Sequence, residues 1–171
     1  MINLKDATKE LHTKAERMPF NKKMMKGELS NEDYSRYLVS QYHIFHTLEK
    51  NFDLPHMDMR RVDSIIEDLK ELGFSDHLET FKGEETTRYC KYLNNLPQVD
   101  ADAHIYLNYL AHMFGGQIIK KNLPGSGKLY EFENVEHIIG SVRRIQTDEW
   151  APEVNKAFTY LINIFDELDE S

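Results

Sequence analysis

The chain has 171 residues, of which 40% are hydrophobic and 29% are charged, a composition typical of a globular protein with a sizeable core. Its formal net charge of −8 argues against general nucleic-acid binding. A single cysteine, Cys90, excludes an internal disulfide and a cysteine-cluster metal site. The N-terminus lacks the apolar segment of a signal peptide and no apolar run is long enough to span a membrane, so we expect a soluble, cytoplasmic protein without a membrane anchor.

Apolar residues recur at helical spacing along most of the chain, and no segment alternates with a period of two for long enough to predict a sheet. Ser30 and Asp33 form an N-terminal capping signal, Gly73 suits a helix C-terminus, and Pro152 falls in the first turn of the last helix. The sequence therefore predicts one all-α domain over residues 1–171. The expected helices span about 4–18, 30–52, 57–72, 86–96, 99–122, 134–145 and 148–168.

The first expected helix carries a histidine and a carboxylate on one face. His12 continues the apolar stripe of Leu4 and Leu11, which predicts that its side chain points inward. Glu16 follows four residues later and is placed to accept a hydrogen bond from the imidazole. A lone histidine of this kind is more often a core residue, but an imidazole held by a carboxylate is also a good axial ligand for heme iron.

Two adjacent glycines, Gly115 and Gly116, interrupt the expected helix that begins near residue 99. Each costs about 1 kcal/mol relative to alanine in a helix interior. They indicate either close helix packing or a bare backbone against which a ligand lies. His112 precedes them by three residues, and Tyr106 and Tyr109 are expected to face the same place. A kinked helix of this kind, opposite the helix of His12, would allow heme to lie between the two.

Other polar groups allow more than one interpretation. The basic pairs Lys22-Lys23, Lys120-Lys121 and Arg143-Arg144 form either solvated helix faces or a patch for an anionic ligand or an acidic redox partner. His43 and His46 have a spacing that suits a metal, but the sequence contains no His-Glu-x-x-His motif and no pair of Glu-x-x-His units. We therefore interpret them as one packed and one solvent-facing histidine.

Four segments carry a resemblance to the heme oxygenase family. Residues 4–16, LKDATKELHTKAE, resemble the proximal helix of these enzymes, and residues 42–49 resemble their Tyr-His-Ile-Tyr…Leu-Glu segment. Residues 106–121 are similar to the distal helix, whose usual form is Tyr-Leu-Gly-Asp-Leu-Ser-Gly-Gly-Gln, and residues 157–168 to the closing helix. The resemblance covers nearly the whole chain in the right order. It implies a helical bundle with heme between a proximal N-terminal helix and a glycine-kinked distal helix.

The resemblance also implies an activity. Enzymes of this family consume O2 and electrons to open heme (iron protoporphyrin IX), which is both substrate and cofactor, and release biliverdin, CO and Fe2+. An external electron donor, ferredoxin or a flavoprotein reductase, would supply the electrons. Carried over residue by residue, the resemblance makes His12 the iron ligand and Glu16 its orienting partner. It places Gly115 and Gly116 over the distal face of heme and Tyr106 near the heme edge. It also pairs Lys5, and a basic residue at Arg143 or Arg144, with the heme propionates.

One departure from the family pattern affects the distal side. Ala111 and His112 stand where most members have glycine and aspartate, and this pair resembles the plant and algal branch, which uses ferredoxin. His112, with an ordinary pKa near neutrality, would either hold water and relay protons or bind iron as a sixth ligand. The second role would make the protein a non-degrading heme carrier or sensor. Phe114 replaces the usual serine, which affects the shape of the pocket.

An enzyme of another class on a related helical fold is a further alternative. A di-iron oxidase would need ligand motifs that this sequence lacks. A thiamin-degrading enzyme would need a nucleophile, and nothing around Cys90 indicates an activated thiol.

Overall fold

The computed structural model describes residues 2–171, and these form helices and loops with no strand. The all-α prediction is therefore confirmed. The α-helices are α1 (Leu4–Glu16), α2 (Pro19–Met25), α3 (Asn31–Asn51), α4 (Val62–Leu72), α5 (Glu84–Asn94), α6 (Gln98–Ile119), α7 (Val135–Ile145) and α8 (Ala151–Glu170). Short 3-10 turns connect them: η1 (Met57–Met59), η2 (Ser75–His77), η3 (Lys120–Asn122), η4 (Lys128–Tyr130) and η5 (Asp148–Trp150).

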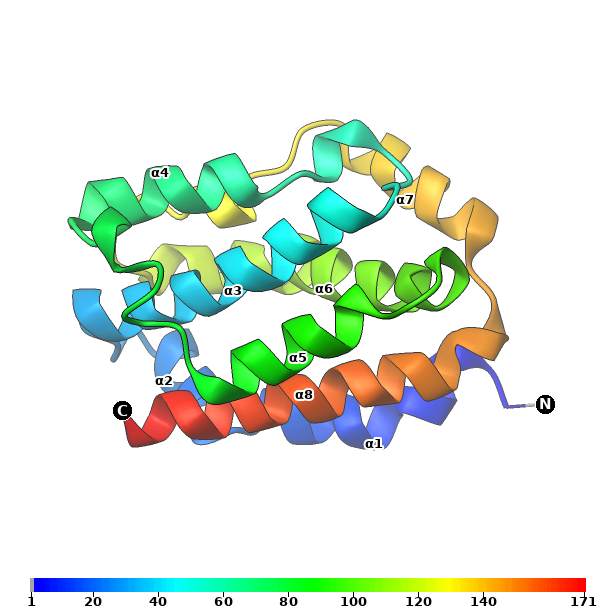
Figure 1. Cartoon of the computed structure of the whole chain (residues 1–171), viewed down its shortest axis with the longest axis horizontal. Helices are drawn as coiled ribbons and strands as arrows, with labels where there is room; N and C mark the ends of the chain where they lie inside the picture. The colour runs from blue at the N-terminus through cyan, green and yellow to red at the C-terminus, as the bar shows by residue number, and fades with distance from the viewer. Residues whose placement is uncertain (1) are drawn as a thin grey trace.

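The helices pack in tiers around one hydrophobic core. Figure 1 shows α3 and α6 in the middle, α4 along one side, and α5, α8 and α1 along the other. α8 packs against α1, α2, α5 and α6, so both α1 and α6 rest on the same helix. The core consists of fully buried apolar and aromatic side chains from most of the elements, among them Leu38, Phe45, Ile65, Leu93, Tyr109, Ile138 and Ala157.

Most of the predicted helix boundaries are confirmed. The Ser30 hydroxyl accepts a hydrogen bond from the Asp33 amide at 3.1 Å, and Gly73 adopts a left-handed φ of 86° after α4. Pro152 lies in the first turn of α8. The first helix ends earlier than expected, at Glu16, and Pro19 begins the separate helix α2 that the periodicity did not predict. Proline suits a first helical turn as well as it suits a helix end.

The expected interruption of the distal helix is wrong, because α6 continues without a break through Gly115 and Gly116 to Ile119. His112, Met113 and Gly116 are all buried, so tertiary packing holds this part of the helix despite its low intrinsic propensity. Within residues 2–171, no helix combines the length and apolar character needed to cross a bilayer.

Candidate functional site

His12 and Glu16 form the pair that the spacing predicts. The Nε2 atom of His12 lies 2.7 Å from Glu16 Oε1. The imidazole stacks on Phe158 of α8, with ring centroids 5.4 Å apart and planes 20° from parallel. The prediction that His12 points inward is wrong, however, because its side chain is 58% exposed. The buried stripe of α1 runs through Leu4, Thr8 and Ala15, and His12 stands at its edge. It therefore offers its second ring nitrogen to the outside of the core.

α6 has an apolar face that no other part of the described chain covers. We call Ala111, Phe114, Gly115 and Ile118 the open face of α6; all four are exposed. Phe114 and Ile118 keep 59% and 69% of their surface, which is unusual for side chains of this size. A Cβ atom added to Gly115 would meet no heavy atom within 4 Å. Gly115 thus presents bare backbone to open space.

Gly116 has a different role from its neighbour. It is buried, and a Cβ atom there would overlap the ring of Tyr130 in η4. The two glycines therefore have different surroundings: Gly115 belongs to the open face, and Gly116 allows Tyr130 to pack against α6. Of the two interpretations of the glycine pair, the bare surface applies to Gly115 and close packing applies to Gly116.

His112 is buried on the side of α6 that faces α3, with 7% of its surface exposed. Its Nε2 atom lies 2.9 Å from Gln41 Oε1. The rings of Phe45 and Tyr130 pack against it, with centroids 5.5 and 5.1 Å away. Burial, and then the positive charge of Arg61, lower the pKa of His112 to about 3. The expectation that it titrates near neutrality is therefore wrong, and the imidazole is neutral at physiological pH.

The two tyrosines upstream point to different places. Tyr109 is fully buried, donates a hydrogen bond to Glu49 Oε2 at 2.9 Å and packs edge-on against Phe45, so it does not face the open face of α6 as expected. Tyr106 is half-buried, and its ring lies 5.4 Å from that of Trp150. Burial raises the pKa of the Tyr106 hydroxyl, so that group remains a proton donor.

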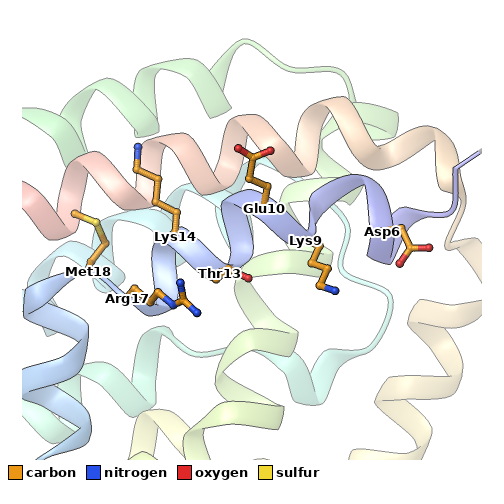
Figure 2. A pocket seen from close by; sticks show the side chains of 7 residues that line it. All are labelled: Asp6, Lys9, Glu10, Thr13, Lys14, Arg17 and Met18. Atoms are coloured by element: carbon orange, nitrogen blue, oxygen red, sulfur yellow. The ribbon is translucent and has the colours of Figure 1, made fainter.

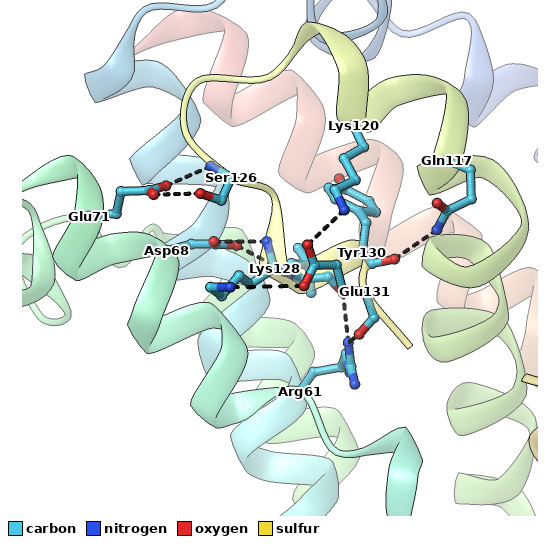
Figure 3. A network of polar contacts seen from close by, with 10 residues as sticks. Arg61, Asp68, Glu71, Gln117, Lys120, Ser126, Lys128, Tyr130 and Glu131 are labelled. Atoms are coloured by element: carbon cyan, nitrogen blue, oxygen red, sulfur yellow. Dashed lines mark hydrogen bonds and ion pairs between the residues drawn. The ribbon is translucent and has the colours of Figure 1, made fainter. Parts of the chain in front are cut away.

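A polar network ties the loop after α6 to α4 and thereby positions Tyr130 (Figure 3). Both oxygens of Asp68 accept backbone N–H groups, from Lys128 and Leu129, each at 2.9 Å. The buried guanidinium of Arg61 donates to the carbonyls of Leu129 and Glu131 at 3.0 and 2.7 Å. Gln117 donates to the Tyr130 carbonyl at 2.8 Å. The loop thus holds the Tyr130 ring between Gly116 and His112.

The predicted propionate-binding cations lie at the end of the bundle where the chain starts. Lys5, Arg143 and Arg144 are exposed, and none of them forms an ion pair with another residue in the range 2–171. The Leu4 amide donates to Asp148 Oδ1 at 2.9 Å, which joins the start of α1 to the turn that follows α7. Figure 1 shows α7 and the start of α1 at the same end of the molecule.

A hollow of about 710 Å3 runs along the outer side of α1 and is not lined by His12. Figure 2 shows Glu10 and Lys14 on one side of α1 and Lys9 and Arg17 on the other. Its walls are mostly charged side chains of both signs on a single helix. It is therefore an open surface groove, separate from the candidate site. No group of three or more histidine, cysteine, aspartate or glutamate side chains within residues 2–171 is arranged to hold a metal ion.

These residues suit heme. An imidazole backed by a carboxylate is a suitable axial ligand, and its stacking on Phe158 holds the ring in one orientation. Exposed apolar side chains and the bare backbone of Gly115 suit a flat apolar macrocycle. Since α1 and α6 both pack on α8, the two halves of the site share one support.

Comparison with known proteins decides the family. The sequence profile described as heme oxygenase matches residues 1–148. The chain belongs to the heme oxygenase family. It is 30% identical to heme oxygenase 1 of Bos taurus over 96% of this chain and 70% of that protein. It is 28% identical to heme oxygenase 2 of Mus musculus over 98% of this chain and 65% of that protein. As a member of this family, the chain is an oxidoreductase that degrades heme.

Solved structures share the fold of this heme oxygenase. The heme oxygenase of Leptospira interrogans superposes with a TM-score of 0.82 at 27% identity, covering 96% of this chain and 97% of that one. Heme oxygenase-1 of the cyanobacterium Synechocystis, solved in complex with heme, gives a TM-score of 0.84 at 23% identity, covering 98% and 90%. At 23% identity, the similarity to the Synechocystis structure shows a shared fold and nothing more.

Gln41 and Phe158 are site residues that the sequence did not single out. Both fall on helix faces that are predicted to be inward, where Phe158 is an ordinary core residue. Gln41 carried a signal, because a buried amide needs a hydrogen-bond partner. Periodicity alone could not identify that partner, which lies 71 residues away on another helix.

Proposed function

We propose that this heme oxygenase opens heme to biliverdin, CO and Fe2+, using O2 and electrons from an external donor protein. The observation that carries the proposal is the His12–Glu16 pair on the exposed edge of α1, together with the bare backbone of Gly115 on a second helix that packs on α8. When bound, heme supplies the redox-active iron and is itself the ring that is opened. The protein supplies binding, orientation and proton placement.

The proximal residues have distinct roles in this proposal. His12 binds the iron through the ring nitrogen that Glu16 does not engage. Glu16 holds the orientation of the ring and raises its basicity as a ligand, as carboxylates do for metal-bound histidines. Lys5 and the Arg143-Arg144 pair are exposed cations at one end of the bundle, and in this proposal they bind the propionates.

The distal residues leave room for O2 and hold a proton relay. Gly115 exposes its backbone on the open face of α6, and Tyr106 closes the pocket near the heme edge. His112 stays neutral and is hydrogen-bonded to Gln41, so it acts by orienting a water molecule at Nδ1. Its burial on another side of α6 from Phe114 and Ile118 favours this role over iron ligation, and hence favours the enzyme over a heme carrier or sensor.

The electron donor is a protein, either ferredoxin or a flavoprotein reductase. Support comes from the exposed cations of α1 and α7 in a chain with a net charge of −8, since a local basic patch attracts an acidic redox protein. The Ala111-His112 pair, similar to the plant and algal branch, favours ferredoxin.

Absorbance spectra with one equivalent of hemin test the proposal. After ascorbate or reduced ferredoxin is added in air, the Soret band should decay while biliverdin absorption grows. A stable six-coordinate spectrum would instead support the carrier. The His12→Ala variant should lose the iron–histidine resonance Raman band and regain heme coordination with added imidazole. His46→Ala, which removes an exposed histidine on α3, is the matched control and should behave as the wild type. An unchanged Raman band in His12→Ala would refute the ligand assignment.

A further inference from the structure

Gln41 lies on α3 and is only 3% exposed. Its side-chain amide contacts α6. Its Oε1 atom lies 2.9 Å from His112 Nε2. An amide oxygen accepts hydrogen bonds but cannot donate them, so this contact requires the proton of His112 to sit on Nε2. The lone pair of the neutral imidazole is then on Nδ1.

The surroundings of His112 prevent other arrangements. Phe45 of α3 and Tyr130 of η4 pack against the ring, which restricts its rotation. The charged group that influences it is Arg61, which precedes α4, and a nearby cation disfavours the imidazolium form. A second proton on Nδ1 is therefore disfavoured by burial and by charge.

Gly115 is the exposed neighbour of His112 on α6. Residues three apart on a helix are neighbours, and Gly115 follows His112 by three. Since a Cβ atom at Gly115 would meet nothing within 4 Å, the helix surface next to the His112 turn is bare, and His112 itself keeps 7% of its surface exposed. A water molecule at that place can donate a hydrogen bond to an acceptor on the ring.

We propose that Gln41 is a positioning residue whose hydrogen bond fixes the rotamer and the tautomer of His112, so that Nδ1 is the acceptor this histidine offers on the distal side. The proposal rests on the proposed water-holding function of His112. It gives Gln41 a role that the family resemblance does not provide. It also explains why a polar side chain occupies a buried position of α3.

The first test uses heme-free protein with 15N-labelled histidine and long-range proton–nitrogen correlation, with His112→Asn to assign the signals. The wild type should show protonated Nε2 and unprotonated Nδ1. Gln41→Glu keeps an acceptor at the same place and should show the same tautomer. Gln41→Leu removes the acceptor, and the Nε2 proton should exchange with water about fivefold faster. Ser40→Ala is the control, because it removes a buried hydrogen bond of α3 to Thr86 and should leave the His112 signals unchanged.

A wild-type protein with the proton on Nδ1 would overturn the proposal, and so would Gln41→Leu with wild-type shifts and exchange. With heme bound, Gln41→Leu should lower kcat about fivefold while the heme Kd stays within about twofold, and Gln41→Glu should restore most of the rate. Unchanged kcat in Gln41→Leu would overturn the positioning role. If the wild type binds heme without degrading it, the proposed function fails, whereas the labelling result still decides the Gln41–His112 arrangement.

Discussion

Replacing each of the two adjacent glycines of α6 by alanine should have opposite effects on stability. Gly115→Ala adds a methyl group to open space, and Gly116→Ala drives one into the Tyr130 ring. Both changes replace a helix-interior glycine and so gain about 1 kcal/mol from helix propensity and reduced unfolded-state entropy. The Gly116 variant also suffers overpacking, which costs about 1–3 kcal/mol. The difference between the two variants isolates that overpacking.

The magnitudes follow from these terms. Gly115→Ala should be about 1 kcal/mol more stable than the wild type, and Gly116→Ala between about 0 and 2 kcal/mol less stable. For a domain of this size 1 kcal/mol corresponds to about 2–4 °C in Tm, so a difference of 2 kcal/mol separates the variants by about 4–8 °C. The helical circular dichroism signal of heme-free protein, followed on heating, measures both values.

Heme affinity should separate the same two variants in the reverse order. The new methyl group of Gly115→Ala stands on the open face of α6, so hemin titration should show weaker binding despite the greater stability. Gly116→Ala should bind hemin nearly as the wild type does once it is folded. Equal Tm values for the two variants, or a Gly116 variant more stable than the wild type, would refute the division of the glycines between two faces.

Two further predictions concern buried charges. Arg61→Met should lower the free energy of unfolding by about 3 kcal/mol, measured by urea titration, because it leaves the carbonyls of Leu129 and Glu131 without their charged donor. The lowered pKa of His112 means that the unfolded chain binds one more proton than the folded chain between pH 6.5 and about 3. The free energy of unfolding should therefore fall as the pH falls through that window, by up to about 1.4 kcal/mol per pH unit. His112→Gln should reduce this slope, and an unchanged slope would contradict the burial argument.

The fold could be predicted from the sequence to a large extent because most of its helices are amphipathic and carry clear end signals. Ser30, Gly73 and Pro152 all act where local chemistry indicates. The errors occur where a signal has two meanings. Pro19 both follows one helix and starts the next, and the glycines of α6 weaken a helix that tertiary packing still maintains.

The site could be predicted in part. The His12–Glu16 pair follows from spacing along one helix, which sequence shows directly. The distinction between Gly115 and Gly116 depends on Tyr130, and the state of His112 depends on Gln41 and Arg61. These partners are distant in the sequence, so neither periodicity nor a family motif identifies them.

The packing around Tyr130 links His112 to the loop that follows α6 and, through it, to Asp68 and Arg61. One ring touches both the backbone of Gly116 and the imidazole of His112. The ring is held by a loop whose backbone is bonded to Asp68 and Arg61. Since Gly116 has no side chain, the loop can approach α6 closely, and the same approach dehydrates His112 and lowers its pKa. Gly116 therefore acts on His112 indirectly, because it leaves space for the Tyr130 ring, whose packing keeps the histidine neutral. Gly115, in contrast, leaves the surface of the helix bare.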